Sequence, residues 1–272
     1  FILMIALIIY VLTQDGAMEG LRHYLVPDFS QITSPKLIVS AMGQAFFSMS
    51  LGVGTMLVYG SYIRADENLP VVGALVTLTD TSVAFLAGLL VLPAIFVAQN
   101  LGVTIYAASG NLIAGPDLIF QVLPALFESM GVAGLFVGFA FFVLMSIAAV
   151  TSSISMLEVP VSYAVEAHQI SRHKATWLVG LLVFGISTII CLNFESLFGF
   201  VITMTTERAQ PLLSMMLCIF AGWIFYRNSI LQELKSGSPD VEQGLFWKIW
   251  PIYVKLFCPV LILLTFAQGF IG

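Results

Sequence analysis

The sequence is short of charged residues, and that shortage indicates where the chain resides. Only 9% of its 272 residues are Asp, Glu, Lys or Arg, against about one quarter in a soluble domain. Hydrophobic residues make up 59%, and the mean hydropathy is +1.01. The net charge is −5 and Lys and Arg form no cluster, so nothing indicates a nucleic-acid-binding surface. The composition excludes an ordinary soluble domain and predicts an integral membrane protein.

Cysteine and histidine are also scarce, and their positions argue against several kinds of site. The three cysteines lie in or beside apolar runs: Cys191, Cys218 and Cys258. We expect them to be neither clustered nor exposed, and so to be small buried hydrophobic side chains rather than zinc ligands or disulfides. The three histidines lie between the apolar runs: His23, His168 and His173. No span therefore pairs a serine with a histidine, and Asp80 has no catalytic partner aspartate in a neighbouring span, so we do not expect an enzyme.

Apolar runs long enough to cross a membrane recur along the chain. The hydrocarbon core of a bilayer is ~30 Å thick and a helix rises ~1.5 Å per residue, so a crossing takes about 20 apolar residues. Complete spans are predicted near residues 38–63, 71–98, 132–165, 175–192, 197–225 and 249–270. The connections are 14–37, 64–70, 99–131, 166–174, 193–196 and 226–248. We therefore expect an all-α polytopic membrane protein.

The opening stretch, FILMIALIIYVLT (1–13), is apolar from its first residue. As a helix it reaches only ~20 Å, too short to cross alone. It lacks the basic flank and cleavage site of a signal peptide. We interpret it as the end of a helix whose start precedes this sequence.

Lys and Arg concentrate in alternate connections, which predicts the orientation. One set of connections carries Arg64, Arg172, Lys174, Arg227, Lys235 and Lys248. The other set carries only Arg22 and Lys36. The positive-inside rule places the first set in the cytoplasm, so connections 64–70, 166–174 and 226–248 are expected there. Connection 99–131 is then external, and its helix-like pieces around Pro116 and Pro124 can fold back as a lid.

The stretch FFSMSLGVGTM (46–56) places Ser48, Ser50, Gly52 and Gly54 inside an apolar span. Gly costs about 1 kcal/mol relative to Ala in a helix interior. One interpretation is close helix packing, although small residues usually recur four apart for that purpose. The other is an unwound segment, which exposes helix ends and free carbonyls to an anion or a cation.

Further polar groups are expected at a similar depth. Asp80 lies near the inner end of its span, in TLTDTSVAFLAG. The stretch SIAAVTSSISM (146–156) carries four hydroxyls: Thr151, Ser152, Ser153 and Ser155. Each hydroxyl can bond the carbonyl four residues back. Together with a broken helix and an acid, they also resemble the hard oxygen ligands that a cation such as Na⁺ prefers.

These segments resemble, in order, parts of the neurotransmitter:sodium symporter family in its bacterial branch. GQAFFSMSLGVGTMLVYGSYIRADENL (43–69) resembles the sixth transmembrane segment, and DTSVAFLAGLLVLPAIF (80–96) the seventh. AAVTSSISMLEVPV (148–161) resembles the eighth, and WPIYVKLFCPVLILL (250–264) the eleventh. The resemblance covers the whole chain, from the end of the fifth segment (1–13) to the eleventh (249–272).

The resemblance implies the LeuT-type inverted-repeat fold, with its broken helices. Residues 38–225 would be the second repeat, with a break near 49–54, an external loop at 14–37 and a cytoplasmic loop at 226–248. Most of the first repeat would be missing, including the first broken helix that supplies about half of the ligands. The expected activity therefore concerns the intact parent protein, whose N-terminal helices would be partners of this chain.

The resemblance also implies site residues. The substrate would contact Phe47, Ser48, Ser50, Val53, Ser152 and Met156, with Phe47 as an outer cap. Sodium would be held by Ser48, Asp80, Ala148 (through its carbonyl), Thr151 and Ser152. Gates and the anion site would use Gln44, Tyr62, Asp80 and Glu166, of which Tyr62 and Glu166 match the inner gate. Without the resemblance, Phe47, Val53 and Met156 read as core residues and Glu166 as a solvated acid.

The sequence departs from the family pattern in three places. Asp80 stands where the family has a sodium-binding asparagine, and the turn that often supplies a chloride-binding serine offers Ala84. We hypothesise that the Asp80 carboxylate replaces chloride, or is protonated while the empty carrier returns. Glu207 and Arg208 are adjacent in the tenth segment and have no clear role. Glu158 precedes Pro160, and we expect a structural role for it.

The expected function is sodium-coupled symport of a neutral, hydrophobic or aromatic amino acid across the bacterial inner membrane. Sodium is the expected co-transported ion, and the lipid bilayer and the amino acid are the expected partners. The alternative is a membrane substrate sensor or a channel-like protein on the same fold. Accumulation of substrate separates the two, because a channel cannot concentrate it.

Overall fold

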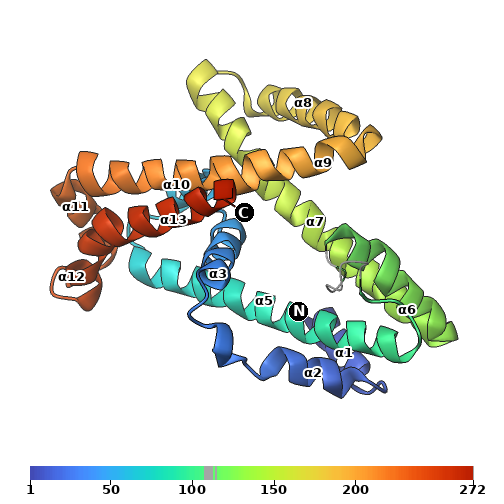
Figure 1. Cartoon of the computed structure of the whole chain (residues 1–272). Coiled ribbons are helices and arrows are strands. Elements are labelled where there is room, and N and C mark those ends of the chain that lie inside the picture. Colours follow the sequence, from blue (N-terminus) through green and yellow to red (C-terminus); the bar gives the residue numbers. More distant parts are fainter. Residues whose placement is uncertain (107–112, 114, 272) are drawn as a thin grey trace. The chain divides into compact units, whose positions relative to one another are not determined.

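The computed structural model describes residues 1–106, 113 and 115–271 (Figure 1). Within these residues the chain is all-α, as the sequence predicts. The two longest helices are α5 (Leu69–Asn100) and α7 (Gly131–His168). The chain divides into two compact units, of which the first is Phe1–Ser30 with Thr79–Ser152 and the second is Gln31–Leu78 with Ser153–Gly272.

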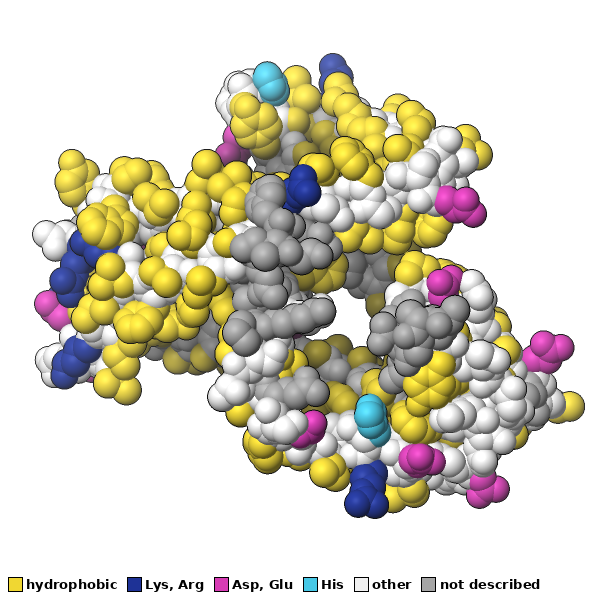
Figure 2. Space-filling view, viewed as in Figure 1, with side chains coloured by type: hydrophobic (Ala, Val, Ile, Leu, Met, Phe, Trp, Pro, Cys, Tyr) yellow, Lys and Arg dark blue, Asp and Glu magenta, His cyan; other side chains and the backbone are white. Residues whose placement is uncertain are grey.

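Several helices have the length and composition needed to cross a membrane. Four pass as single helical runs: α5, α7, α8 (Arg172–Leu192) and residues Leu245–Leu264. Two more pass as bent pairs, Ile2–Leu12 with Ala17–Leu25 and Phe194–Ile224 with Arg227–Gly237. Figure 2 shows hydrophobic side chains over much of the visible face and charged ones in a few places. A lipid bilayer is the environment that suits such an apolar surface, so the chain is part of an integral membrane protein.

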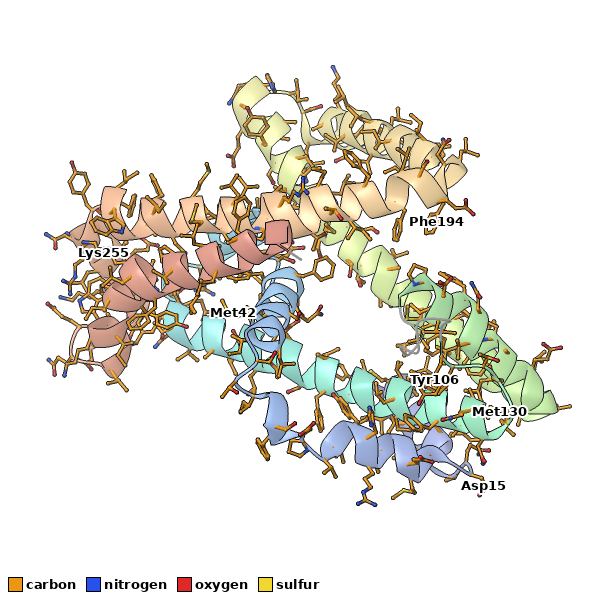
Figure 3. The ribbon with its side chains drawn as sticks, viewed as in Figure 1. Asp15, Met42, Tyr106, Met130, Phe194 and Lys255 are labelled. Atoms are coloured by element: carbon orange, nitrogen blue, oxygen red, sulfur yellow. The ribbon has the colours of Figure 1, made fainter. Side chains whose placement is uncertain are left out.

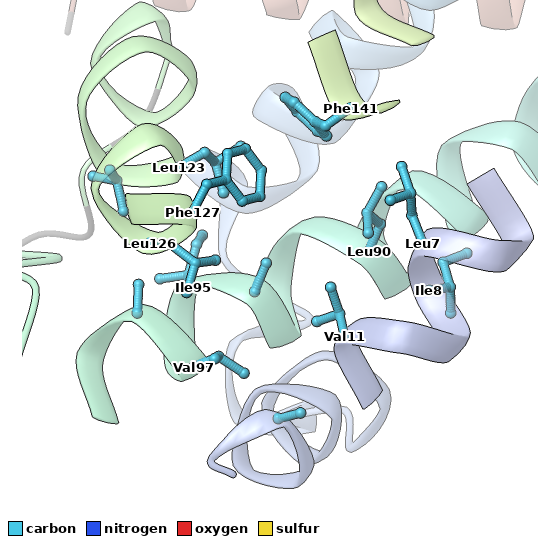
Figure 4. Packing of buried hydrophobic residues seen from close by; sticks show 14 of the residues in the cluster. Leu7, Ile8, Val11, Leu90, Ile95, Val97, Leu123, Leu126, Phe127 and Phe141 are labelled. Atoms are coloured by element: carbon cyan, nitrogen blue, oxygen red, sulfur yellow. The ribbon is translucent and has the colours of Figure 1, made fainter. Parts of the chain in front are cut away.

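The core of the first unit joins helices from both ends of its sequence. α1 (Ile2–Leu12) packs Leu7 and Val11 against Leu90 of α5, and Phe141 of α7 closes the same cluster (Figure 4). The predicted external connection 99–131 adds a π-helical turn η2 (Leu118–Val122) and α6 (Leu123–Ser129), whose apolar side chains complete the cluster. This part of the connection is therefore packed, and its function as a lid stays a prediction.

The predicted connection 14–37 also contains helical structure. α2 (Ala17–Leu25) follows a sharp turn, and a 3-10 turn, η1, covers Phe29–Gln31. Gly20 of α2 lies so close to α5 that a Cβ there would meet Pro93. The small residue therefore brings two backbones together, as glycine does between membrane helices.

The second unit contains the remaining helices. They are α3 (Pro35–Ser48), α4 (Thr55–Tyr62), α8, α9 (Phe194–Ile202), α10 (Gln210–Ile219), α11 (Arg227–Gly237), α12 (Leu245–Ile252) and α13 (Cys258–Ile271), with π-helical turns η3 (Thr203–Ala209), η4 (Phe220–Ile224) and η5 (Tyr253–Phe257). α10 packs against α13 and α3. The turns η4 and η5 also meet, at Trp223 and Lys255. Trp223 Nε1 donates to the carbonyl oxygen of Lys255 at 3.2 Å, and the Lys255 ammonium lies 4.9 Å from the indole centroid. Lys255 is labelled in Figure 3.

The expectation that the cysteines are neither clustered nor exposed is wrong. Cys191 is exposed on α8. Cys218 of α10 and Cys258 of α13 are half-buried, their side chains interact, and both line one cavity. Packing of α10 against α13 brings the two thiols together, which their separation in the sequence does not reveal.

Candidate functional site

The second unit contains an interrupted helix. α3 ends at Ser48 and α4 begins at Thr55, so residues 49–54 have no regular helix, where the sequence predicts a break. Ser50, Gly52 and Gly54 have φ angles of 51°, 80° and 88°, all in the left-handed region. Glycine adopts such angles at little cost, whereas a serine there is uncommon. The break is therefore built into the sequence at this point.

The backbone of the break lies directly on α10. The side-chain amide of Gln210 donates from Nε2 to the carbonyl oxygen of Phe46 at 2.9 Å. A Cβ at Gly52 would collide with the carbonyl oxygen of Gln210 and with Ser214. Glycine is thus required at position 52 both by its φ angle and by the space available.

Buried hydroxyls lie at the same place. Thr55 is 5% exposed and Ser214 is 4% exposed. Within the part of the chain that the structure describes, neither hydroxyl oxygen has a hydrogen-bond partner. Most buried polar groups in proteins are paired, so these hydroxyls mark the break as an unusual environment.

Two apolar cavities flank the break within the second unit. The first is about 560 Å³, and the broken segment lines it with Gly52, Val53 and Gly54 while α10 and η4 line the other side. The second is about 390 Å³ and lies between α3, the start of the break, α10, η5 and α13. A cavity of this size and lining suits an apolar group of a small molecule.

The predicted substrate residues fall into two groups. Phe47, Ser48, Ser50 and Val53 lie in or next to the break, and Phe47 is half exposed. Ser152 and Met156 lie on α7, and Met156 is exposed. Their shared contact with one substrate stays a prediction.

The predicted sodium ligands include a favourable oxygen cluster on α7. Thr151 Oγ1 lies 2.9 Å from the carbonyl oxygen of Ala148 and 3.0 Å from that of Ile147, and donates to them. The intrahelical bonding that the sequence leaves open is therefore present. The same hydroxyl and carbonyl oxygens are hard ligands that fit Na⁺. Asp80 lies on α5, and the roles of Asp80, Ser48 and Ser152 in a cation site stay predictions.

At the other end of α4, Tyr62 contacts an acid. Its hydroxyl donates to Glu158 Oε1 at 2.5 Å and lies 3.1 Å from Ser162 Oγ. Arg172 Nη2 donates to both carboxylate oxygens of Glu158, at 2.7 and 2.6 Å. The cluster joins α4, α7 and the start of α8, and the bonds that the Glu158 carboxylate accepts are charge-assisted.

The acid next to Tyr62 is Glu158, for which the sequence predicts a structural role, and the role of Glu166 at the inner gate stays a prediction. Glu166 is exposed near the end of α7, where its backbone carbonyl accepts from Gln169 Nε2 at 2.8 Å. The sequence did carry a signal for Glu158, because an acid inside an apolar helix is expensive and usually functional. Its partners Ser162 and Arg172 lie 4 and 14 positions further along the chain.

The structure assigns no role to the other predicted residues. Gln44 is exposed on α3. The Glu207 side chain lies outside the described residues. Arg208 approaches Met204 of the same π-helical turn, with Nη1 3.9 Å from Sδ. The roles of all three positions stay open.

Comparison with known proteins shows which family the chain resembles. The sodium:neurotransmitter symporter family model matches residues 1–272. An uncharacterized sodium-dependent transporter of Haemophilus influenzae is 35% identical over 99% of this chain and 58% of its own length. The uncharacterized sodium-dependent transporter YhdH of Bacillus subtilis is 32% identical over 98% of this chain and also 58% of its own length. The chain thus spans little more than half the length of these relatives.

A solved structure agrees. The crystal structure of MhsT in complex with L-phenylalanine superimposes with a TM-score of 0.81 and 34% sequence identity. The match covers 98% of this chain and 60% of that one. The sequence similarity, the fold and the broken helix therefore agree that this chain belongs to the sodium:neurotransmitter symporter family.

Proposed function

We propose that the protein containing this chain is a sodium-coupled symporter of a neutral, hydrophobic or aromatic amino acid. The observation that carries the proposal is the broken helix α3–α4, in a chain that matches the family along its whole length. Such a break places free carbonyls and helix ends at the middle of a membrane, where they can bind a cation and a zwitterion. The expected location is the plasma membrane, which is the inner membrane in a bacterium that has two membranes.

The proposed substrate site uses the broken segment and α7. Phe47 covers the substrate from outside, Ser48 and Ser50 contact it at the break, and Val53 with Met156 shapes the side-chain pocket. Two observations support an apolar amino acid: the apolar cavity that Val53 lines, and the L-phenylalanine bound in the MhsT structure. N-terminal helices of the same protein would complete the site.

The proposed sodium sites use oxygen ligands from this chain. Ser48 and Asp80 contribute to one site, and the Ala148 carbonyl, Thr151 and Ser152 contribute to the other. Sodium entering the cell supplies the work, at ~2.3 kcal/mol per charge per 100 mV of membrane potential plus the concentration term. Sodium binding would complete the substrate site and favour the state that is open to the outside.

The proposed inner gate is the polar cluster at the end of α4. Tyr62, Glu158 and Arg172 hold α4, α7 and α8 together on the side that the positive-inside rule assigns to the cytoplasm. Opening toward the cytoplasm would break these bonds. Glu166 is the further gate acid that the family resemblance implies.

Uptake of labelled amino acids into proteoliposomes tests the proposal. The complete protein is reconstituted and assayed with and without an inward sodium gradient. We expect phenylalanine or a related amino acid to accumulate above equilibrium only with the gradient. Sodium-dependent binding without accumulation would favour a substrate sensor, and equilibration without accumulation would favour a channel.

The role of Asp80 is tested in the same assay. If its carboxylate replaces chloride, wild-type uptake needs no chloride, and Asp80→Asn creates or increases a chloride requirement. Stimulation of the wild-type protein by chloride would contradict the replacement.

A further inference from the structure

Two side chains of α10 contact the broken segment, and the family resemblance assigns neither of them. Gln210 is the first residue of α10 and is 6% exposed. Its carboxamide donates to the Phe46 carbonyl across 164 positions of sequence. Ser214 lies one turn further along, on the same face of the helix.

The Phe46 carbonyl, which accepts the Gln210 amide, lies in the last turn of α3. The last four carbonyls of a helix lose their partners four residues ahead. Phe46 O accepts the N–H of Leu51 at 3.0 Å, in a wider turn than an α-helix makes, and the Gln210 amide supplies a second bond. The carbonyl oxygen thus accepts two bonds, and the one from Gln210 ties the end of α3 to α10.

Ser214 acts on the break by being small. Its buried hydroxyl has no hydrogen-bond partner among the described residues, so hydrogen bonding does not explain its position. It lies where a Cβ on Gly52 would collide with both its Oγ and its backbone nitrogen. The broken helix thus lies on the polar face of α10, where Gln210 contacts Phe46 and Ser214 contacts Gly52.

We propose that Gln210 and Ser214 are positioning residues of the transport site. Gln210 holds the Phe46 carbonyl, and Ser214 leaves room for Gly52, so together they fix the path of residues 47–51. That path directs Phe47, Ser48 and Ser50, the residues expected to contact the substrate. The inference rests on the proposed function, because the residues that it positions are assigned there.

The test compares Gln210→Met with wild type in the complete protein. Methionine keeps the length of the side chain and removes the donor. We expect the KM for labelled phenylalanine to rise about five- to tenfold, the range one net hydrogen bond gives. Vmax per folded transporter should stay within about twofold, a split that a general loss of stability would not produce.

Thr188→Val is the matched control. Thr188 Oγ1 donates to the Phe184 carbonyl within α8, so this change also removes one side-chain hydrogen bond from a membrane helix. It does not touch the break, and its KM should equal that of wild type. Ser214→Ala should also leave KM unchanged, whereas Ser214→Val should raise it. If Gln210→Met does not fold, the two Ser214 variants still test the positioning role through the contact with Gly52.

Hydrogen–deuterium exchange gives a readout that does not depend on transport. The peptide covering residues 46–56 should exchange faster in Gln210→Met than in wild type or Thr188→Val. Unchanged exchange would overturn the Gln210 contact. Faster exchange with an unchanged KM would overturn the positioning role. If the wild-type protein binds no amino acid at all, the proposed function fails and the positioning role fails with it, while exchange still decides the contact.

Discussion

At the scale of single residues, Gly52 is the most constrained position in the break. It combines a φ angle of 80° with a backbone that lies against Gln210 and Ser214. We expect Gly52→Ala to lower the free energy of unfolding by more than about 1 kcal/mol, because a side chain there strains the backbone and also collides. The melting temperature of the purified protein measures this loss.

Gly60 supplies the comparison for Gly52. It lies in α4, has an ordinary helical φ, and no atom lies within 4 Å of the Cβ that alanine would add. Gly60→Ala should be neutral or slightly stabilising, since alanine favours the helix. Equal losses from both substitutions would mean that the break needs no glycine at position 52.

Thr151 distinguishes a sodium ligand from a hydroxyl that only bonds its own helix. If it binds sodium, Thr151→Val should raise the sodium concentration for half-maximal uptake by about tenfold or more, as loss of an oxygen ligand predicts. Thr151→Ser keeps the hydroxyl and should restore near-normal sodium dependence. An unchanged sodium dependence in Thr151→Val would mean that the bonds to Ile147 and Ala148 are its whole role.

At the scale of helices, the two residues of the ion pair between α7 and α8 should differ in how much stability is lost when each is replaced. The Glu158 side chain is 15% exposed and that of Arg172 is 62% exposed. Removing Arg172 leaves a largely buried carboxylate without its cation, which is the more costly change. We expect Arg172→Gln to lower the melting temperature more than Glu158→Gln, and a double-mutant cycle should detect coupling between the two side chains.

The pair Arg64 and Asp66 is the control for that cycle. Both side chains are more than two-thirds exposed, and their separation is 3.0 Å. A surface pair contributes about 0–1 kcal/mol, so its coupling should be the smaller of the two. Equal coupling energies would show that burial of Glu158 has no effect.

Trp223 tests the contact between η4 and η5. Its indole N–H donates to the Lys255 carbonyl, a bond that phenylalanine cannot make. We expect Trp223→Phe to reduce the free energy of unfolding by about 1 kcal/mol. Trp177 is 61% exposed on α8, so Trp177→Phe should change it by less than about 0.5 kcal/mol.

At the scale of the whole molecule, the distribution of Lys and Arg predicts which loops face the cytoplasm. In a variant without the native cysteines, Ser236→Cys on α11 should react with a membrane-impermeant thiol reagent only from the inside. Ser30→Cys should react only from the outside. Both serines are exposed, so access depends on the side of the membrane. The reverse pattern would overturn the orientation.

Local features carried most of what could be predicted. The apolar runs predict the long helices because a membrane span needs a long local stretch of apolar residues. Gly52 and Gly54 allowed either close packing or a break, because glycine acts on its own backbone, and the family resemblance favoured the break. The helices α2 and α11, in two of the connections, were not predicted, because those segments are less apolar and gain stability from packing on neighbours.

The site was predicted less completely, because its contacts join distant parts of the chain. Tyr62 was expected at the inner gate, but the sequence did not indicate that Glu158 contacts it. Gln210 gave no signal, since a single glutamine in a helix has many possible roles. Cys218 and Cys258 seemed isolated along the sequence and lie together in the fold.

The sequence by itself determined that this chain belongs in a membrane and how its long helices are spaced, and its family resemblance indicated where one of them breaks, since each follows from residues close together. Only the tertiary structure decided what the break rests on, which acid Tyr62 contacts and which thiols meet. Those contacts depend on how helices pack, and packing selects partners by shape and direction between residues as much as 164 positions apart in the sequence.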